Sequence, residues 1–418
     1  MNKIIFHIDM DSFFVSCERS INTNLIDKPV VIAKRYKRSI ISAMSYEVKN
    51  LGYRVGSSLY TVLEKVPNLL IVEPHYDLYS LISKKIFDYL KNKYCTQLEI
   101  YSIDECYIDF SNTISNWEEA KNLAQQIKDD ILKTFMIPCS IGISFTKFLA
   151  KMSTNKAKPS GILITKKEDI ERNFYSLPVE KIFGVGKNIS QQLIKNKIST
   201  YKDLLECNNE IFLRKLFKKN FFLFIEQLKG INATDHILNL ETKGISNTIT
   251  FMEKDSDDIV FLKNELFKLA RNVANRAVNN NYECRCVEVL IRKQDKKWMS
   301  EQRKIDFFTN DIDIIFKIAL KLFLNLWNEK ECLRGLGIRI CDLRSIFQEN
   351  KQVNLFEDNN QKSIVNSILN EVNTKFEGKI LITGKQYLLE NSIDIDNIKF
   401  LRKNNQPYDK KINLEEKK

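Results

Sequence analysis

Apolar and polar residues alternate along some stretches of the chain and recur at helical spacing along others, and the two patterns predict a series of strands and helices. Apart from an early helix at 12–21 and an insertion at 25–74, residues 3–144 follow the order strand, helix, strand, strand, helix, strand. This is the split βαβ order of a four-stranded sheet backed by two helices. The strands are expected at 3–9, 98–103, 106–110 and 139–144, and the helices at 78–90 and 117–131. Within the insertion, apolar runs predict two short strands at 30–33 and 39–43.

The rest of the chain contains two further regions. Residues 166–235 have an all-helical pattern, in which Gly184 and Gly186 tighten a turn just before a helix start. Such a turn leaves free amide groups and the positive end of a helix dipole facing outward, which suits a phosphate. A polar stretch near 235–245 is expected as a linker, and 246–343 repeats the strand, helix, strand, strand, helix, strand order. The predicted fold class is α+β with several domains.

The charge of the chain narrows the choice of partner. Its 418 residues include 65 Lys and Arg against 53 Asp and Glu, a formal net charge of +12. Such a field attracts polyanions, of which nucleic acid is the first candidate and an acidic membrane surface the second. No window is long and apolar enough for a membrane span, and no signal-like apolar segment is complete before Asp9, so a cytosolic protein is expected. The nine cysteines include no CxxC pair and are expected to be reduced thiols.

Two adjacent acids, Asp104 and Glu105, interrupt two runs of strand-forming residues. Acids are poor strand residues and neighbouring carboxylates repel each other, so a cation is expected between them. Asp9 ends the first strand of the same predicted sheet and would meet them there. Three carboxylates in a chain with only three histidines suit a hard cation such as Mg²⁺. Two such ions about 4 Å apart could activate a hydroxyl nucleophile and neutralise a leaving pyrophosphate.

Each acid taken singly has a plainer interpretation, a carboxylate that faces water at a strand end or a turn. This alternative applies to Asp9, Asp11, Asp104, Glu105 and Asp109. Their joint placement favours the metal site.

Several basic residues are candidates for phosphate binding. Lys158, in KAKPSG, could anchor a triphosphate, although a lysine near such a turn is also explained by solvation, and the same holds for Tyr46 and Lys49 in SYEVK. Gly186-Lys187 is not a Walker phosphate loop, because no Gly stands five residues before Gly186. The histidines are too few and too isolated for a metal site or a nucleophile relay and are expected to be structural: His7, His75 and His236.

Four segments carry a resemblance to a known family. They are IDMDSFFVSCE at 8–18, SYEVKNLG at 45–52, YSIDECYID at 101–109 and CSIGISFTKFLAKMSTNKAKPSGI at 139–162. In this order and spacing they make the chain resemble Y-family, translesion DNA polymerases over residues 1–345. The resemblance implies low-fidelity, template-directed addition of deoxynucleotides to a DNA primer opposite damaged templates, in DNA repair and damage-induced mutagenesis. It also implies two Mg²⁺ ions, held by Asp9, Asp104 and Glu105 as the catalytic ligands with help from the main-chain carbonyl of Met10.

The same resemblance implies how the substrate is held. Tyr46 and Lys158 would bind the triphosphate of the incoming deoxynucleotide. Lys49 stands where the family usually has Arg, which keeps the charge but loses the bidentate fork. Phe14 falls at the family's steric gate, where a flat ring leaves no room for a 2′-hydroxyl, and Phe13 beside it is a second candidate with a core aromatic as the alternative.

The implied architecture is a right hand. The palm spans 1–24 and 75–165, the small fingers 25–74 and the helical thumb 166–235, with its helix-hairpin-helix-like turn. A linker at 236–245 leads to a little finger at 246–343 and a tail at 344–418. Primer-template DNA would be gripped through Gly184, Gly186, Lys187, Arg292 and Lys293.

The tail contains QVNLF at 352–356, which is similar to the short sliding-clamp peptide of bacterial polymerases. Gln352, Leu355 and Phe356 would fill the groove of the clamp, although a string this short also arises by chance. Tethering would raise the local concentration of a weakly bound enzyme. A monomer in the bacterial cytoplasm, associated with the nucleoid, is expected. Residues 361–398 have apolar spacing for one helix and a strand, with no role assigned.

Two other function classes remain open from the residues alone. A two-metal nuclease or transposase also places scattered acids on a sheet, but it would cut DNA without nucleoside triphosphates. A noncatalytic DNA-binding scaffold docked on the clamp would bind DNA in a salt-dependent way and extend no primer. Within the family, the motifs do not separate the self-sufficient kind from the kind that needs accessory subunits, and they leave lesion preference and error spectrum undetermined.

Overall fold

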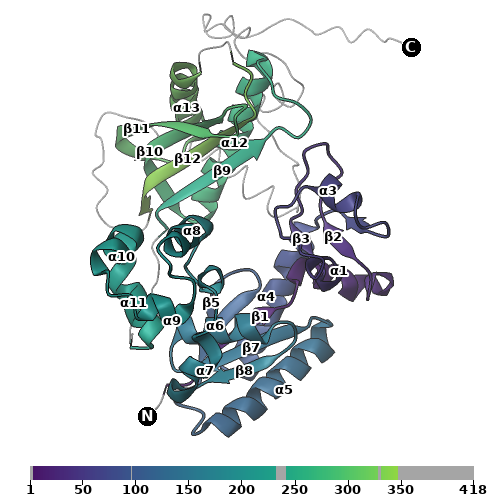
Figure 1. Cartoon of the computed structure of the whole chain (residues 1–418). Helices are drawn as coiled ribbons and strands as arrows, with labels where there is room; N and C mark the ends of the chain where they lie inside the picture. The colour runs from purple at the N-terminus through teal and green to yellow at the C-terminus, as the bar shows by residue number, and fades with distance from the viewer. Residues whose placement is uncertain (1–2, 96, 232–241, 328–330, 347–418) are drawn as a thin grey trace, which may run out of the picture. The chain divides into compact units, whose positions relative to one another are not determined.

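The computed structural model describes residues 3–95, 97–231, 242–327 and 331–346 (Figure 1). The chain divides into two compact units, Met1–Asn239 and Leu240–Lys418. The predicted clamp segment at 352–356 and the segment at 361–398 lie outside the described residues. No helix in the described ranges has the length and apolar character needed to cross a membrane. All nine cysteines lie within those ranges and are unpaired, as predicted.

The first unit is built on a five-stranded sheet in the order β5-β6-β1-β7-β8. The strands are β1 (Ile5–Met10), β5 (Glu99–Ile100), β6 (Glu105–Asp109), β7 (Cys139–Ser144) and β8 (Ile162–Thr165). β7 and β8 are parallel, and the other neighbouring pairs are antiparallel. The split βαβ arrangement is confirmed. The prediction of four strands is wrong by one, because β8 returns beside β7 after a helix that the apolar pattern did not indicate.

Helices cover both faces of this sheet, which explains why all six residues of β1 are buried. On one face, Phe6 and Ile8 belong to a core shared with α4 (Tyr76–Lys93) and α5 (Trp117–Phe135). On the other face, Ile5 packs with Ala150 of α6 (Lys147–Ala157). Since side chains alternate along a strand, His7 and Asp9 share the α6 face with Ile5.

The contact between α6 and β7 depends on one glycine. A Cβ atom at Gly142 would stand 2.1 Å from the main-chain oxygen of Ala150 and 2.2 Å from the main-chain nitrogen of Thr154. Both atoms belong to backbone that cannot move aside, so only glycine permits this approach. The hydroxyl of Thr146 accepts a hydrogen bond from the amide of Leu149 and caps the start of α6. The position of α6 over the sheet is therefore tightly fixed.

The insertion after β1 contains a three-stranded sheet in the order β3-β2-β4. Its elements are β2 (Val30–Ile32), β3 (Ala43–Met44), α2 (Tyr46–Lys49), α3 (Leu59–Leu63) and β4 (Leu70–Val72), and it packs against α1 (Phe13–Ile21). The strand predicted at 30–33 is confirmed, whereas the strand predicted at 39–43 is wrong. The backbone of Ile41 bonds to Ser57 and Gly56 in a loop, so that pairing with β2 begins only at Ala43.

The helical region that follows is confirmed over the described part of 166–235. It comprises α7 (Ile170–Phe174), α8 (Lys187–Lys195), α9 (Tyr201–Leu205), α10 (Glu210–Phe217) and α11 (Phe221–Lys229). Short 3-10 turns occur at Thr23–Leu25, Lys167–Asp169, Val179–Lys181 and Lys218–Asn220. The helices share a hydrophobic core with Phe148, Leu149 and Met152 of α6. This helix therefore links the five-stranded sheet to the helical region.

The second unit is a four-stranded antiparallel sheet with two helices. Its elements are β9 (Gly244–Thr250), α12 (Ile259–Asn279), β10 (Tyr282–Arg292), β11 (Trp298–Thr309), α13 (Ile312–Leu326) and β12 (Gly335–Ser345). The predicted order of elements is confirmed, but the expectation that it repeats the first topology is wrong. The strand order is β11-β10-β12-β9, which leaves the first strand at the edge, whereas β1 is central in the first unit.

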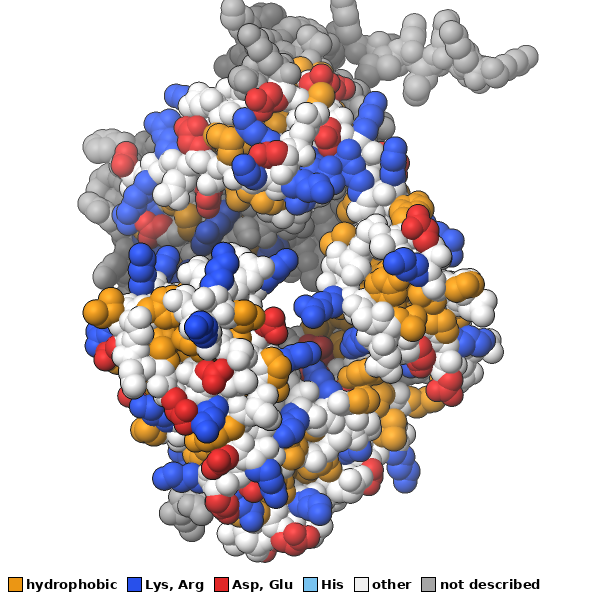
Figure 2. Space-filling model, viewed as in Figure 1, with side chains coloured by type: hydrophobic (Ala, Val, Ile, Leu, Met, Phe, Trp, Pro, Cys, Tyr) orange, Lys and Arg blue, Asp and Glu red, His pale blue; other side chains and the backbone are white. Residues whose placement is uncertain are grey.

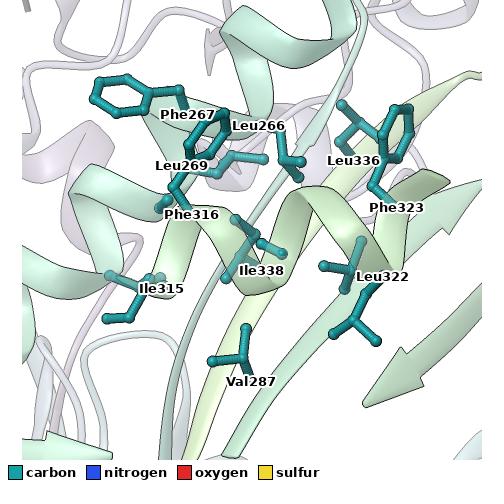
Figure 3. Packing of buried hydrophobic residues seen from close by; sticks show 14 of the residues in the cluster. Leu266, Phe267, Leu269, Val287, Ile315, Phe316, Leu322, Phe323, Leu336 and Ile338 are labelled. Carbon is teal, nitrogen blue, oxygen red and sulfur yellow. The ribbon is translucent and has the colours of Figure 1, made fainter. Parts of the chain in front are cut away.

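The core of the second unit lies between the sheet and its two helices (Figure 3). Phe316 of α13 meets Phe267 of α12 edge to face, with ring centroids 5.0 Å apart. Val287 of β10 and Ile338 of β12 belong to the same buried cluster. Burial alternates along most of β10, which is the pattern of a sheet with one face on a core and one face toward solvent.

Candidate active site

The sheet brings two distant carboxylates together. Asp9 at the end of β1 stands directly opposite Glu105 at the start of β6, and the amide of Met10 donates to the carbonyl of Asp104 over 2.9 Å. Opposed residues of antiparallel strands direct their side chains to the same face, with Cβ atoms about 4.5–5.5 Å apart. The predicted meeting of Asp9 with the 104–105 corner is therefore present.

Asp9 is an almost completely buried acid, 2% exposed. The ammonium of Lys158 lies 2.6 Å from its carboxylate. Burial raises the pKa of Asp9 to about 7 even though Lys158 favours the charged form, and the nearby Glu105 adds to the rise. Asp9 is therefore not a water-facing acid, because its carboxylate is buried and paired with Lys158. Lys158 is the lysine that was expected to bind the triphosphate.

Glu105 is surrounded by two groups from the α6 face. It accepts a hydrogen bond from Lys151 of α6, and its carboxylate lies 3.4 Å from the Nε2 atom of His7. Burial acts to raise the pKa of Glu105, but contacts with His7 and Lys151 outweigh it and hold the pKa below its ordinary value. Glu105 is therefore anionic at neutral pH.

His7 was expected to be structural, and it proves to touch the site. The ring is fully buried, and its Nδ1 atom lies 2.9 Å from the hydroxyl of Thr154. That hydroxyl also lies within hydrogen-bond distance of two main-chain carbonyls, and Nε2 faces the carboxylate of Glu105, whose charged form a proton on Nε2 favours. Burial lowers the pKa of His7 to about 4, so the ring is neutral at pH 7.

Asp104 has different surroundings from Glu105. Its carboxylate accepts a hydrogen bond of 2.5 Å from the hydroxyl of Ser102. Within the described ranges, no three Asp, Glu, His or Cys side chains are grouped so as to hold one ion. The structure thus pairs Asp9 with Glu105, and the part of Asp104 in metal binding stays a prediction.

The residues assigned to the triphosphate lie around the same corner. The hydroxyl of Tyr46 donates to Asp11 over 3.0 Å, and the ammonium of Lys49 donates to Ser12 over 2.8 Å and lies 4.4 Å from the centroid of the Tyr46 ring. Desolvation and the nearby Lys158 lower the pKa of Lys49. Lys49 and Tyr46 of α2 and Lys158 at the end of α6 therefore bring two cations and a phenol together beside Asp9, which is the charge pattern that a polyphosphate requires.

The two aromatic candidates separate clearly. Phe13 is 3% exposed and belongs to the core beneath the sheet, so its burial argues against contact with a substrate. Phe14 is only partly buried and stacks on Tyr79, with ring centroids 4.3 Å apart at 16°. The hydroxyl of Tyr79 donates to the buried Glu18 over 2.6 Å, which fixes the ring beneath Phe14. Phe14 is thus a flat, supported side chain that could contact a sugar.

The predicted DNA contacts occupy two separate places. Gly184 has φ +88, and Gly186 caps the start of α8, so the turn before Lys187 forms as the sequence indicated. In the second unit, Arg292 donates to Thr250 over 3.0 Å, while the ammonium of Lys293 lies 2.8 Å from Glu331. Lys and Arg side chains are spread over the visible face of each unit (Figure 2).

Two residues of the site were missed from the sequence although signals existed. His7 lies two positions before Asp9 on a strand, and this spacing places both side chains on one face. Lys151 lies seven positions before Lys158, a spacing close to two helical turns that ends one residue beyond α6, so both can lie on the same side. Neither spacing identified the partner acid, because the register between β1 and β6 is set by the fold.

Family models match both units of the chain. The impB/mucB/samB family matches residues 8–155, and the C-terminal domain of the same family matches residues 242–355. DNA polymerase IV 1 of Halalkalibacterium halodurans is 30% identical over 94% of this chain and 95% of its own length. DNA polymerase IV of Oceanobacillus iheyensis is 30% identical over 92% of each chain.

Solved structures give the same picture of the fold. A Y-family DNA polymerase chimera of Dbh and Dpo4 superposes with a TM-score of 0.73 at 24% identity, covering 81% of this chain and 98% of the chimera. An insertion ternary complex of Dbh DNA polymerase gives a TM-score of 0.57 at 22% identity, with the same coverage. The motifs, the paired acids and these relatives agree, and the chain belongs to the impB/mucB/samB family, the Y-family DNA polymerases, among which it is similar to DNA polymerase IV.

Proposed function

We propose that this translesion DNA polymerase transfers deoxynucleotides to a DNA primer at the corner formed by Asp9, Asp104 and Glu105. The observation that carries the proposal is the register of β1 and β6, which opposes Asp9 and Glu105 at one end of the sheet. Family membership supports a polymerase over a nuclease or a noncatalytic scaffold.

The carboxylates fit divalent ions. The buried Asp9 and the partly buried Glu105 face each other across the strands, and lysine ammonium groups from one neighbouring segment balance them: Lys158 on Asp9 and Lys151 on Glu105. All the donors offered are oxygens, which suits Mg²⁺, and the carbonyl of Met10 lies at the same strand end. Two Mg²⁺ ions, when bound, would supply neutralisation of the triphosphate charge and a lower pKa for the primer hydroxyl.

Lys158 has a second partner available in this arrangement. Its contact with Asp9 satisfies the carboxylate in the free protein, and any cation on Asp9 would compete with that contact. Once released, the ammonium remains beside Tyr46 and Lys49, where the triphosphate would lie. We infer that Lys158 exchanges Asp9 for a phosphate oxygen, so that charge stays balanced before and after the substrate binds.

The remaining assignments follow the same reasoning. Phe14, supported by Tyr79, would exclude a 2′-hydroxyl. The five-stranded sheet and its helices would be the palm at 1–24 and 75–165, with fingers at 25–74, a thumb at 166–235 and a little finger at 246–343. DNA phosphates would meet the turn at 184–187 and the basic strands around Arg292, consistent with the net charge of +12. The protein would act on DNA as a monomer in the bacterial cytoplasm, near the nucleoid.

The tail adds a proposed partner. Residues Gln352, Leu355 and Phe356 match the spacing of a sliding-clamp peptide and lie outside the described residues. Attachment to a clamp would keep a weakly bound polymerase near the primer end. Replacing Leu355 and Phe356 with alanine should remove clamp-stimulated extension while leaving extension without the clamp unchanged.

The central experiment is primer extension by the purified chain on undamaged and damaged templates. The double variant Asp104→Ala, Glu105→Ala should extend no primer. A charge-matched control, Asp129→Ala with Glu118→Ala at exposed positions of α5, should extend normally. Extension that survives the double change at 104–105 would end the proposal. Labelled duplex incubated with Mg²⁺ alone should stay intact, and cleavage there would favour a nuclease.

A further inference from the structure

Asp11 is a buried acid outside the predicted metal set. It is 2% exposed, although its place just after β1 suggested a water-facing carboxylate. Its backbone is held on both sides, because its amide donates to the carbonyl of Pro138 over 2.8 Å and its carbonyl accepts from the hydroxyl of Ser16 over 2.6 Å. The side chain therefore projects from a fixed point.

The carboxylate accepts hydrogen bonds from three separate parts of the first unit. Ser140 of β7 donates over 2.9 Å, Tyr46 of α2 donates over 3.0 Å, and the main-chain amide of Ser160 donates over 2.7 Å. Ser140 belongs to the central sheet, Tyr46 to the insertion at 25–74, and Ser160 to the loop after α6. Asp11 thus ties a short helix and a loop to the sheet.

Two of these donors belong to the segments that are assigned to triphosphate binding. Tyr46 is itself one such group, and Ser160 follows Lys158 by two residues. A buried carboxylate is costly unless its oxygens are satisfied, so the three donors are held firmly in place around it. The position of the Tyr46 hydroxyl relative to the loop that follows Lys158 is therefore set largely through Asp11, while Asp9 holds the Lys158 ammonium itself.

We propose that Asp11 is a positioning residue for the incoming nucleotide, which holds Tyr46 and the Lys158 loop at the spacing that the triphosphate needs. This inference rests on the proposed function. In the free protein, the single phenolic proton of Tyr46 points to Asp11. When a triphosphate binds, that proton turns to a phosphate oxygen, and Asp11 keeps the bonds from Ser140 and Ser160.

The two available substitutions of Asp11 act differently. Alanine removes all three acceptor contacts and frees both Tyr46 and the loop. Asparagine keeps one oxygen to accept from the Ser160 amide, and its NH₂ group can donate to the Tyr46 oxygen instead of accepting from it. If Asp11 acts by positioning, Asp11→Asn therefore retains normal nucleotide binding. If the negative charge is required, Asp11→Asn weakens nucleotide binding as Asp11→Ala does.

Single-nucleotide incorporation with varied deoxynucleotide concentration tests the inference. Asp11→Ala should raise KM for the nucleotide about tenfold with kcat changed less than about threefold, and DNA affinity should stay the same. Asp11→Asn should keep KM within about threefold of the parent. Ser20→Ala, which removes a similar serine bond to a main-chain carbonyl within α1 and away from Asp11, should leave KM unchanged. Combining Asp11→Ala with Tyr46→Phe should raise KM by clearly less than the product of the single effects.

The outcomes separate this inference from the proposed function. A parent protein that extends no primer would refute the proposed function. A parent that extends primers, with Asp11→Ala showing the same KM, would refute only the role of Asp11. Equal losses of kcat, DNA affinity and melting temperature in Asp11→Ala and Asp11→Asn would show a purely structural acid. If Asp11→Ala fails to fold, the double-mutant cycle of Asp11→Asn with Tyr46→Phe decides, and strictly additive effects overturn the inference.

Discussion

The buried His7 ring should make the stability of the first unit depend on pH in a defined window. Burial lowers its pKa to about 4 from an ordinary value of 6.5. Between these values the unfolded chain takes up a proton that the folded chain excludes, so stability is present above pH 6.5 and is lost as pH falls toward 4. Below that range the loss stops growing.

The size of the effect follows from the width of the window. Each pH unit costs about 1.4 kcal/mol while only the unfolded state is protonated. Lowering the pH from about 7.5 to about 5.5 should therefore remove about 1.4 kcal/mol through His7, and the full effect reaches about 3 kcal/mol near pH 4. Asp9 acts in the opposite direction, because its raised pKa contributes stability at low pH that is lost as pH rises through about 7. The parent protein alone would thus show a partly cancelled slope.

A matched variant isolates His7 from Asp9. His7→Gln keeps an amide in the site and cannot take up a proton, so its unfolding free energy should fall by about 1.4 kcal/mol less than that of the parent over the same pH change. Urea unfolding in EDTA buffer measures this, followed by the fluorescence of Trp117 in a background where Trp298 and Trp327 are phenylalanine. Trp117 then reports the first unit alone. The exposed ring of His75 supplies the control, His75→Gln.

The reasoning is refuted if the unfolding free energies of the parent and of His7→Gln change equally with pH. If the parent and His7→Gln lose the same unfolding free energy between the two pH values, the buried ring does not exclude the proton and the assigned cause is wrong. A His75→Gln effect as large as the His7→Gln effect would also refute it, because it would show that exposure does not govern the response.

Three further substitutions test other parts of the structure. Phe14→Ala should let ribonucleotides in and lower sugar discrimination on the order of tenfold or more, measured by competition between matched nucleotides; unchanged selectivity would remove Phe14 from the gate. Lys49→Arg restores the fork that a phosphate accepts and should lower KM for the nucleotide by about threefold, and an unchanged KM would place Lys49 away from the triphosphate. Gly142→Ala should lower the unfolding free energy by about 3 kcal/mol, because the new Cβ meets the backbone of α6 at 2.1 Å. Gly186→Ala, whose Cβ would meet nothing within 4 Å, is its control, and equal losses would contradict the close contact.

The sequence predicts the elements of the first sheet well, because their apolar periodicity reflects burial directly. β1, for example, lies at Ile5–Met10 against an expected strand at 3–9. The strand expected at 39–43 fails for a physical reason, since a run of five apolar or small residues also suits a loop that bonds to another loop. Local pattern contains no information about that partner.

Strand order and register are the features that local sequence does not contain. The two units share one order of elements, yet β1 is central in its sheet and β9 is at the edge. The same limit applies to the site. Asp9 pairs with Glu105 because β1 lies beside β6, and Asp11 bonds to Ser140 because β1 also lies beside β7. These strand neighbours are set by the tertiary fold and not by local sequence.

Asp104 and Glu105 suggested a cation between them, but the structure separates their environments. Glu105 begins β6, opposes Asp9 and is balanced by Lys151, which is itself buried. Asp104 lies just before the strand and bonds to Ser102. Glu105 therefore stabilises the fold by pairing a buried ammonium that would be costly if left alone. Asp104 makes no such ion pair within the described part of the chain, and its role in binding a cation stays a prediction.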